Sequence, residues 1–115
     1  MKYMLMFARN DEAFLGEPNL ESTYAQIESW FEDLGRKGKM ESGYELQPAG
    51  NATTVRWDSD RPIVTDGPFV EAKEHIAGYA IVEAADLDEA IAIASGWPAH
   101  GHALEIRPVV WHDSH

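Results

Sequence analysis

Two segments of the chain are apolar on both sides of an extended strand. In residues 2–8 every position after Lys2 is apolar: Tyr3, Met4, Leu5, Met6, Phe7 and Ala8. Because successive side chains of a strand point to opposite faces, both faces of this strand are apolar. Residues 76–83 have the same two-sided character. Because an apolar sheet face has to be covered, both segments are predicted to be strands with packing partners on each side.

Two other segments have the spacing of amphipathic helices. The first covers residues 20–34 and has an inner apolar stripe of Tyr24, Ile27, Phe31 and Leu34. Asn19 or Ser22 is predicted to cap its start, and Gly35 or Gly38 to end it. The second helix is predicted at residues 86–94, with Asp86 and Glu89 at the spacing of a capping box.

The remaining segments are short strands separated by turns. The strands are predicted at residues 43–47, 53–57, 62–65 and 104–110. Residues 10–19 are predicted to be a polar loop, and residues 48–51 and 58–60 to be turns. A further turn is predicted at Asp66-Gly67-Pro68, where glycine permits an unusual φ and proline fixes its own.

This order of elements is that of a split βαβ unit. It predicts one α+β domain over residues 1–115, a ferredoxin-like plait whose antiparallel sheet carries two helices on one face. Two helices leave the other face of the sheet bare, although the strands at residues 2–8 and 76–83 are apolar on both sides. We therefore expect a homodimer in which two such sheets pack face to face.

Charge and composition narrow the classes of partner. Nine lysine and arginine residues stand against 20 aspartate and glutamate residues, which gives a formal net charge of −11. So acidic a surface repels nucleic acids and anionic membranes, and neither is expected as a partner. The absence of cysteine excludes disulfides and thiolate metal sites. Without a signal peptide or an apolar stretch of about 20 residues, a soluble cytoplasmic protein is expected.

The motifs of the second half resemble the DGPF group of the YCII-related proteins. They comprise Thr53-Thr54-Val55-Arg56, Val64-Thr65-Asp66-Gly67-Pro68-Phe69, Glu71-Ala72-Lys73-Glu74, Gly78-Tyr79 and Glu105-Ile106-Arg107-Pro108-Val109. The resemblance covers nearly the whole chain and implies a dimeric α/β barrel. It also implies a genomic association with sigma factors of the extracytoplasmic-function type, and a biochemical activity that is generally not assigned in this group.

One feature of the YCII proteins proper is missing from this chain. Their proposed catalytic pair is a histidine in the first helix and an aspartate near the end of the second. Residues 20–34 contain no histidine here, and the position before Pro98 holds Trp97. The pair is therefore not carried over, and the residues leave open whether the protein is an enzyme.

The best candidate site is the signature segment itself. Asp66, Lys73 and Glu74 could bind a polar ligand, and one carboxylate beside another has a raised pKa suited to a general base. Glu71 is a weaker candidate of the same group. His75 is the histidine next to this segment and could act as an acid or base near neutral pH. The alternative is structural: Asp66 shapes its turn, and the other charges are solvated or paired.

Other chemistry-bearing residues have competing interpretations. Arg56 and Arg107 lie on predicted strands and could bind a carboxylate or phosphate, but ion pairs with the many acids are favoured. His100 and His102 with Glu105 could form a divalent metal site; His112 and His115 lie in a polar tail. A loop position for His100 and His102 argues against that site, so no metal or cofactor is predicted. The aromatic residues Trp57, Phe69, Tyr79 and Trp97 are predicted to pack in the core or dimer interface.

Three functions remain open. The first is binding or conversion of a small polar molecule in a cleft near Asp66, with Asp66 and His75 as catalytic residues and Arg56, Lys73, Glu74 and Arg107 as ligand contacts. The second is a regulatory or interaction module that docks on a sigma factor. The third is a structural role, in which the turn at Asp66 shapes the loop that closes a dimer.

Overall fold

Strand β1 (Lys2–Arg9) lies inside a four-stranded sheet in the computed structural model, which describes residues 1–70 and 72–110. The strand order is β2-β5-β1-β6, and every pairing is antiparallel. The second central strand is β5 (His75–Glu83), which pairs with β1. The edge strands are β2 (Met40–Glu45) and β6 (Ala103–Pro108). The two segments with apolar residues on both sides are strands, as predicted, and the structure places them at the centre of the sheet.

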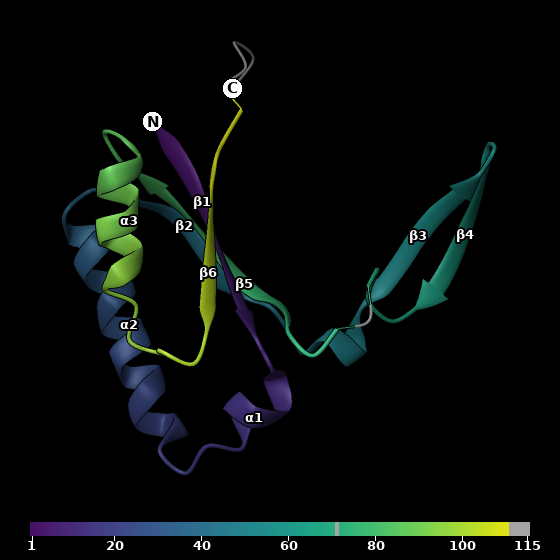
Figure 1. Cartoon of the computed structure of the whole chain (residues 1–115), viewed down its shortest axis with the longest axis horizontal. Helices are drawn as coiled ribbons and strands as arrows, with labels where there is room; N and C mark the ends of the chain where they lie inside the picture. Colours follow the sequence, from purple (N-terminus) through teal and green to yellow (C-terminus); the bar gives the residue numbers. More distant parts are fainter. Residues whose placement is uncertain (71, 111–115) are drawn as a thin grey trace.

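Helices α2 (Leu20–Arg36) and α3 (Leu87–Ser95) lie together on one face of this sheet (Figure 1). The chain thus has an α+β fold consistent with the ferredoxin-like arrangement. The predicted cap of α3 by Asp86 is confirmed, because the Asp86 side chain accepts a hydrogen bond from the Glu89 amide. The Glu89 side chain accepts a hydrogen bond from the amide of Ala85, one residue before the cap. α2 follows Asn19 rather than Ser22, and its C-terminal turn closes before Gly38, whose φ is 69°.

The predicted polar loop at residues 10–19 is wrong in part, because it contains a third helix. Helix α1 (Asp11–Leu15) begins after Asn10, whose side-chain oxygen accepts a hydrogen bond of 2.9 Å from the Ala13 amide. The acids Asp11 and Glu12 occupy its first turn, where they complement the helix dipole. The capping signal of Asn10 was present in the sequence but was masked by the polar composition that follows.

The core lies between the sheet and the two long helices. Its floor is the inner side of β1 and β5, on which Leu5, Ala80 and Val82 are fully buried. Aromatic rings fill the space above them: the Phe7 ring stacks on Trp97 at 4.2 Å, and Trp30 meets Trp97 edge-on. Trp97, predicted to be a core or interface residue, is a core residue.

The opposite face of the sheet has no cover from the described part of the chain. Its centre carries half-buried apolar side chains on facing positions of β1 and β5: Met4 opposite Ile81, and Met6 opposite Tyr79. Arg107 and Glu105 of β6 flank these pairs. We call this surface the open face.

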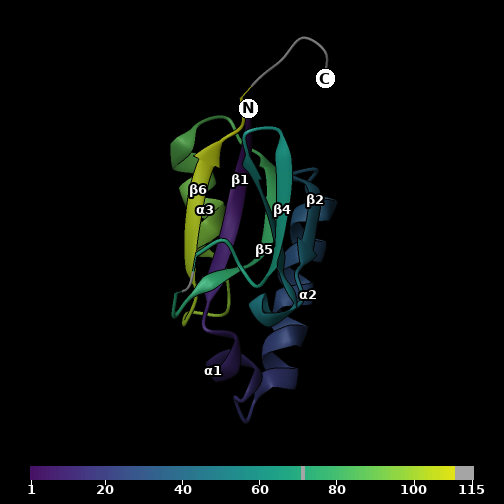
Figure 2. The ribbon, with the colours of Figure 1, turned by 90° about the vertical axis from the view of Figure 1, so that its right-hand side faces the viewer.

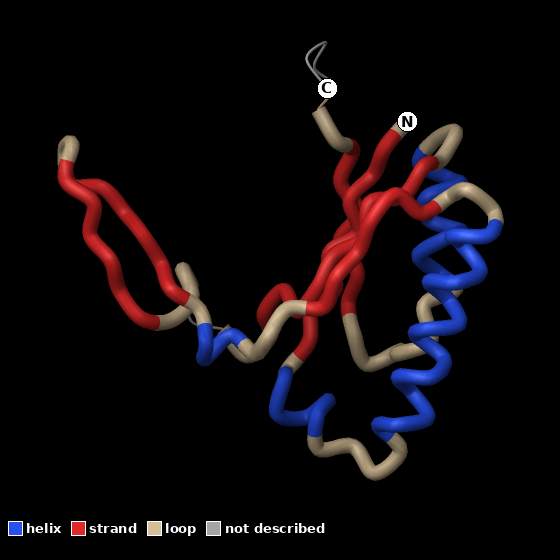
Figure 3. Tube along the Cα trace, turned by 180° about the vertical axis from the view of Figure 1, so that it is seen from behind, coloured by secondary structure: helices blue, strands red, loops and turns tan. Residues whose placement is uncertain are grey.

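The strands β3 (Thr53–Asp58) and β4 (Arg61–Asp66) do not join the main sheet. Among the described strands they pair with each other alone and form a hairpin that stands away from the sheet (Figures 1 and 3). This hairpin is called the arm below. The short 3-10 helix η1 (Ala49–Asn51) leads into it. The sequence predicted these strands but placed them in one common sheet; Trp57 and Phe69, predicted to be packed, are 66% and 67% exposed here.

Candidate functional site

A buried arginine marks the end of β1. Arg9 continues the inward-facing series of β1 beyond Phe7, and only 5% of it is exposed. Its Nε donates to Asp11 Oδ1 at 2.8 Å, and its Nη2 donates to Glu45 Oε2 at 2.9 Å. Its guanidinium carbon lies 4.4 Å from the centre of the Phe14 ring. Arg9 is thus held by two carboxylates and an aromatic ring.

The two carboxylates are themselves fixed by other elements. Asp11, in the first turn of α1, also accepts from the Ala49 amide at 3.2 Å. Glu45, at the end of β2, also accepts from the Tyr24 hydroxyl of α2 at 2.5 Å. One hydrogen-bonded network therefore joins β1, α1, α2, β2 and η1 at this end of the sheet.

Burial and pairing oppose each other in this network. Burial acts against the charged form of Arg9, but the hydrogen bonds to Asp11 and Glu45 raise its pKa above the usual value. Burial likewise acts against the charged form of Asp11, yet the bond from Arg9 holds the pKa of that carboxyl below its usual value. Burial, followed by the bond to Glu45, raises the pKa of Tyr24. The network is an ion pair at neutral pH with a neutral tyrosine attached.

His102 lies beside this network on the loop before β6. The Trp97 indole N–H donates to His102 Nδ1 at 3.1 Å, so the proton of the neutral ring is on Nε2. Nε2 is buried and has no hydrogen-bond partner among the described residues. Burial, and then the charge of Arg9, lower the pKa of His102. In this geometry His102 is a neutral hydrogen-bond donor at Nε2.

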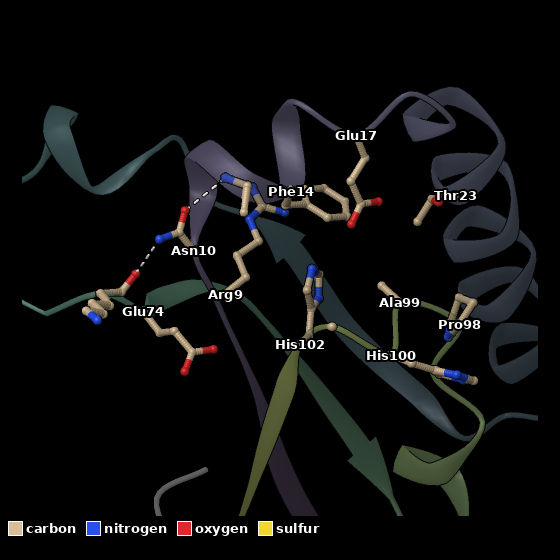
Figure 4. Close-up of a pocket in the computed structure, with 13 residues that line it drawn as sticks. Arg9, Asn10, Phe14, Glu17, Thr23, Glu74, Pro98, Ala99, His100 and His102 are labelled. Carbon is tan, nitrogen blue, oxygen red and sulfur yellow. Dashed lines mark hydrogen bonds between the residues drawn. The ribbon is translucent and has the colours of Figure 1, made fainter.

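A cleft of about 460 Å³ opens over Arg9 and His102 (Figure 4). Its walls come from α1, the start of α2, the segment before β5 and the loop before β6. The polar residues that line it are Arg9, Asn10, Glu17, Thr23, Lys73, Glu74, His100 and His102. Asn10 ties two walls together, because its Nδ2 donates to the Lys73 carbonyl at 3.1 Å. The volume is within the range of small-molecule sites.

Two of the predicted ligand contacts line this cleft, and one predicted residue lies next to it. Lys73 and Glu74 form part of the wall. His75 begins β5 opposite Arg9, and with Glu74 it lines a second, more open hollow between β5 and the base of the arm. The structure thus brings Lys73, Glu74 and His75 to one end of the sheet.

The other predicted residues lie elsewhere. Asp66 ends β4 on the arm, opposite Thr53, and it lines neither hollow. Arg56 is also on the arm, where its Nη2 donates to the Phe69 carbonyl at 3.3 Å and its guanidinium covers the Phe69 ring. Arg107 is on the open face, 3.9 Å from Glu105. Glu71, His112 and His115 lie outside the described residues.

The described residues contain no group of three metal-ligating side chains close enough to hold an ion. His100 is exposed, and His102 is turned toward Trp97 rather than toward Glu105. The same part of the chain has no helix that is long and apolar enough to cross a membrane.

Comparison with known proteins identifies the family. A family model described as the YCII-related domain matches residues 1–112. The chain belongs to the YCII-related family. A second match is to an uncharacterized protein of Rhizobium meliloti (strain 1021), which is 37% identical over 76 residues. That match covers 63% of this YCII-related chain and 60% of the relative's own length.

The sequence predictions missed the network at the floor of the cleft of this YCII-related domain. Arg9 was placed after the first strand, yet it continues the alternation of Leu5 and Phe7 and so points to the same covered side. A buried arginine needs carboxylate partners, and Asp11, two residues on, was the nearest signal. Glu45 and Tyr24 come from distant segments, and only the folded sheet brings them to Arg9.

Proposed function

We propose that this YCII-related domain binds a small polar molecule in the cleft around Arg9. The observation that carries the proposal is the buried Arg9, held between Asp11 and Glu45 at the floor of an open cleft. Burying an arginine costs folding free energy even when the arginine is paired with carboxylates. An apolar side chain at position 9 could fill the same space without that cost. Perturbed, buried charges beside a cleft are characteristic of functional sites.

The charges around the cleft favour a neutral or positively charged ligand. Glu17 and Glu74 stand at its walls against a single lysine, Lys73. Arg9 adds no free positive charge, because two carboxylates already face it. The net charge of −11 makes the electrostatic potential around the protein negative, and this potential steers cations toward it. Amines and zwitterions fit this site better than phosphates or dicarboxylates.

The hydrogen bond from Trp97 makes His102 a donor in the cleft floor rather than a base. An imidazole whose Nδ1 accepts and whose Nε2 carries the proton has no free lone pair to take a second proton. We therefore propose binding as the primary activity. Catalytic roles for Asp66 and His75 stay predictions, as does docking on a sigma factor.

The test is a screen of small amines, amino acids and carboxylates for a ligand that raises the melting temperature. The dissociation constant of each hit is then measured for the wild type, Glu74→Gln and Asp66→Asn. We expect Glu74→Gln, in the cleft wall, to weaken binding about twofold to fivefold, as for a partly exposed charge pair. Asp66→Asn is the matched control, and binding within error of the wild type is expected.

Two results would contradict this proposal. One is that no compound in a broad library stabilises the wild type. The other is that Asp66→Asn weakens binding as much as Glu74→Gln or more, which would move the site to the arm and restore Asp66 as the central residue.

A second proposal concerns assembly: we infer that two copies pair through the open face. The supporting observation is the apolar centre of that face, where Met4, Met6, Tyr79 and Ile81 are half-buried and no helix of the described residues lies over them. Met6→Lys should then dissociate the dimer in sedimentation equilibrium, whereas Ser29→Lys, the same charge change on the exposed side of α2, should not. A monomeric wild type would rule the pairing out.

A further inference from the structure

The arm is a two-sided ribbon with one apolar side. Directly opposed residues share a side of an antiparallel pair, and Val55 faces Val64 while Trp57 faces Pro62. The third pair on this side, Thr53 with Asp66, is polar and lies at the base of the arm. The other side carries three mostly polar pairs: Thr54 with Thr65, Arg56 with Ile63, and Asp58 with Arg61. The alternation is that of a strand pair with one side against a core and the other in water.

Within residues 1–70 and 72–110 of a single copy, the apolar side of the arm has no core to pack against. Trp57 is 66% exposed and Val64 is 63% exposed. A two-stranded hairpin alone in water is only marginally stable. An exposed apolar ribbon of this kind is a surface that packs against something else.

The dimensions of the chain lead to the same conclusion. The radius of gyration is 16.1 Å for 115 residues, whereas a compact chain of this length has about 13 Å. The difference arises because the arm stands clear of the sheet, as Figures 1 and 2 show together. Because the arm lies outside the core of the described residues, we expect its packing partner in another molecule.

The base of the arm fixes its direction. The Gly67 amide donates to the Ala52 carbonyl at 2.7 Å, and the Thr54 hydroxyl donates to the Gly67 carbonyl at 2.7 Å. Gly67 has a φ of 104°, in a region that glycine adopts without strain. The arm therefore leaves the molecule at a defined angle, on the side of the sheet opposite α2 and α3 (Figure 1).

We propose that the arm of each copy packs its apolar side, Val55, Trp57, Pro62 and Val64, against a second copy of this chain. This inference rests on the proposed pairing through the open face, because a second copy seated there lies on the side toward which the arm projects. A two-fold axis makes both contacts equivalent, so each copy gives an arm and receives one. Because the partner is a second copy of the same chain, it is present wherever the folded chain is present.

The test compares two neighbouring lysine substitutions on β4 by sedimentation equilibrium. Val64→Lys places a charge on the apolar side, and Thr65→Lys places the same charge on the polar side. The wild type is expected to be a dimer. Val64→Lys should raise its dissociation constant about tenfold or more, because a buried apolar side chain is lost at two symmetric contacts. Thr65→Lys should change it by less than about threefold.

Because a lysine at position 64 could also loosen the arm itself, Trp57 gives a second readout. Its fluorescence is obtained as the difference between the wild type and Trp57→Phe. Iodide should quench this emission less in the dimer than after dilution to the monomer. Equal quenching in both states would overturn the inference.

The outcomes separate this inference from the pairing on which it rests. A monomeric wild type overturns both. A dimer that Met6→Lys dissociates but Val64→Lys leaves intact overturns the role of the arm and keeps the open-face pairing. Equal weakening by Val64→Lys and Thr65→Lys also overturns it, since the apolar side would then have no special part. The cleft around Arg9 is unaffected by any of these results.

Discussion

At the scale of single residues, Arg9 is the position on which this end of the molecule depends. It is buried among carboxylates from α1 and β2, and the hydroxyl of Tyr24 extends the same network to α2. Removing one member of such a group leaves the others facing a space built for a charge. The cost should therefore depend on how far the remaining carboxylates can reach water.

We expect Arg9→Met to lower the free energy of unfolding by about 1–3 kcal/mol. The value lies below that of a fully buried pair because Glu45 is 45% exposed and can rehydrate. Arg36→Met is the matched control: Arg36, at the end of α2, is 67% exposed, and its loss should change stability by less than about 0.5 kcal/mol. Urea denaturation measures both, and equal effects of the two variants would contradict the account of Arg9.

His102 should give the stability a dependence on pH near neutrality. Its pKa is lowered in the folded state by burial and by Arg9, so the unfolded chain binds a proton more readily. The contribution of neutral His102 to the free energy of unfolding is therefore fully present above the unfolded pKa of about 6.5. This contribution is lost as the pH falls below that value. Protonation also removes the Nδ1 lone pair that accepts from Trp97. The lowered pKa of Asp11 acts in a separate window, below about pH 4.

The measurement is the free energy of unfolding at pH 7.5, 6.5 and 5.5. His102→Gln should flatten the wild-type decline over this interval, whereas His100→Gln, on the same loop but exposed, should leave it in place. If the free energy of unfolding of His102→Gln falls with pH as steeply as that of the wild type, His102 is not the group that titrates.

At the scale of elements, the close packing of α2 on the sheet requires a glycine on β2. A Cβ at Gly43 would lie 2.6 Å from Phe31 Cε1 and 3.0 Å from the Tyr79 carbonyl oxygen. To admit one methyl group, the Phe31 ring of α2 would have to move and the backbone of β5 would have to yield at Tyr79. The glycine is therefore a packing requirement, and its backbone conformation does not demand it.

Gly43→Ala should destabilise the protein by about 1–3 kcal/mol, the usual cost of overpacking. Gly50→Ala is the control, because nothing lies within 4 Å of a Cβ at that position; its effect should be below about 0.5 kcal/mol. Thermal denaturation of both variants checks this, and a neutral Gly43→Ala would show that the helix packs less tightly than described.

The elements that local patterns define were predictable from the sequence. Apolar side chains on both faces identified the strands β1 and β5, and the spacing of Asp86 and Glu89 identified the start of α3. Pairing was not predictable in the same way. Residues 53–66 read as two more strands, and nothing local distinguishes a hairpin that joins the sheet from one that leaves it. The same limit hid the site, because Tyr24 and Glu45 reach Arg9 only through the tertiary fold.

At the scale of the whole molecule, two surfaces stand out beyond the core. The open face and the apolar side of the arm carry half-buried or exposed apolar residues on the side of the sheet away from the helices. The cleft around Arg9 opens at the end of the same sheet, with Lys73 and Glu74 in its wall. We propose that ligands bind in that cleft, away from Asp66.

The most direct test is to map a ligand found in the screen by the changes it causes in backbone amide chemical shifts. We expect the largest changes to cluster at the residues that form the cleft: Arg9, Asn10, Lys73, Glu74, His100 and His102. Largest changes at Asp66 and its neighbours on the arm, with Arg9 and His102 unmoved, would contradict it.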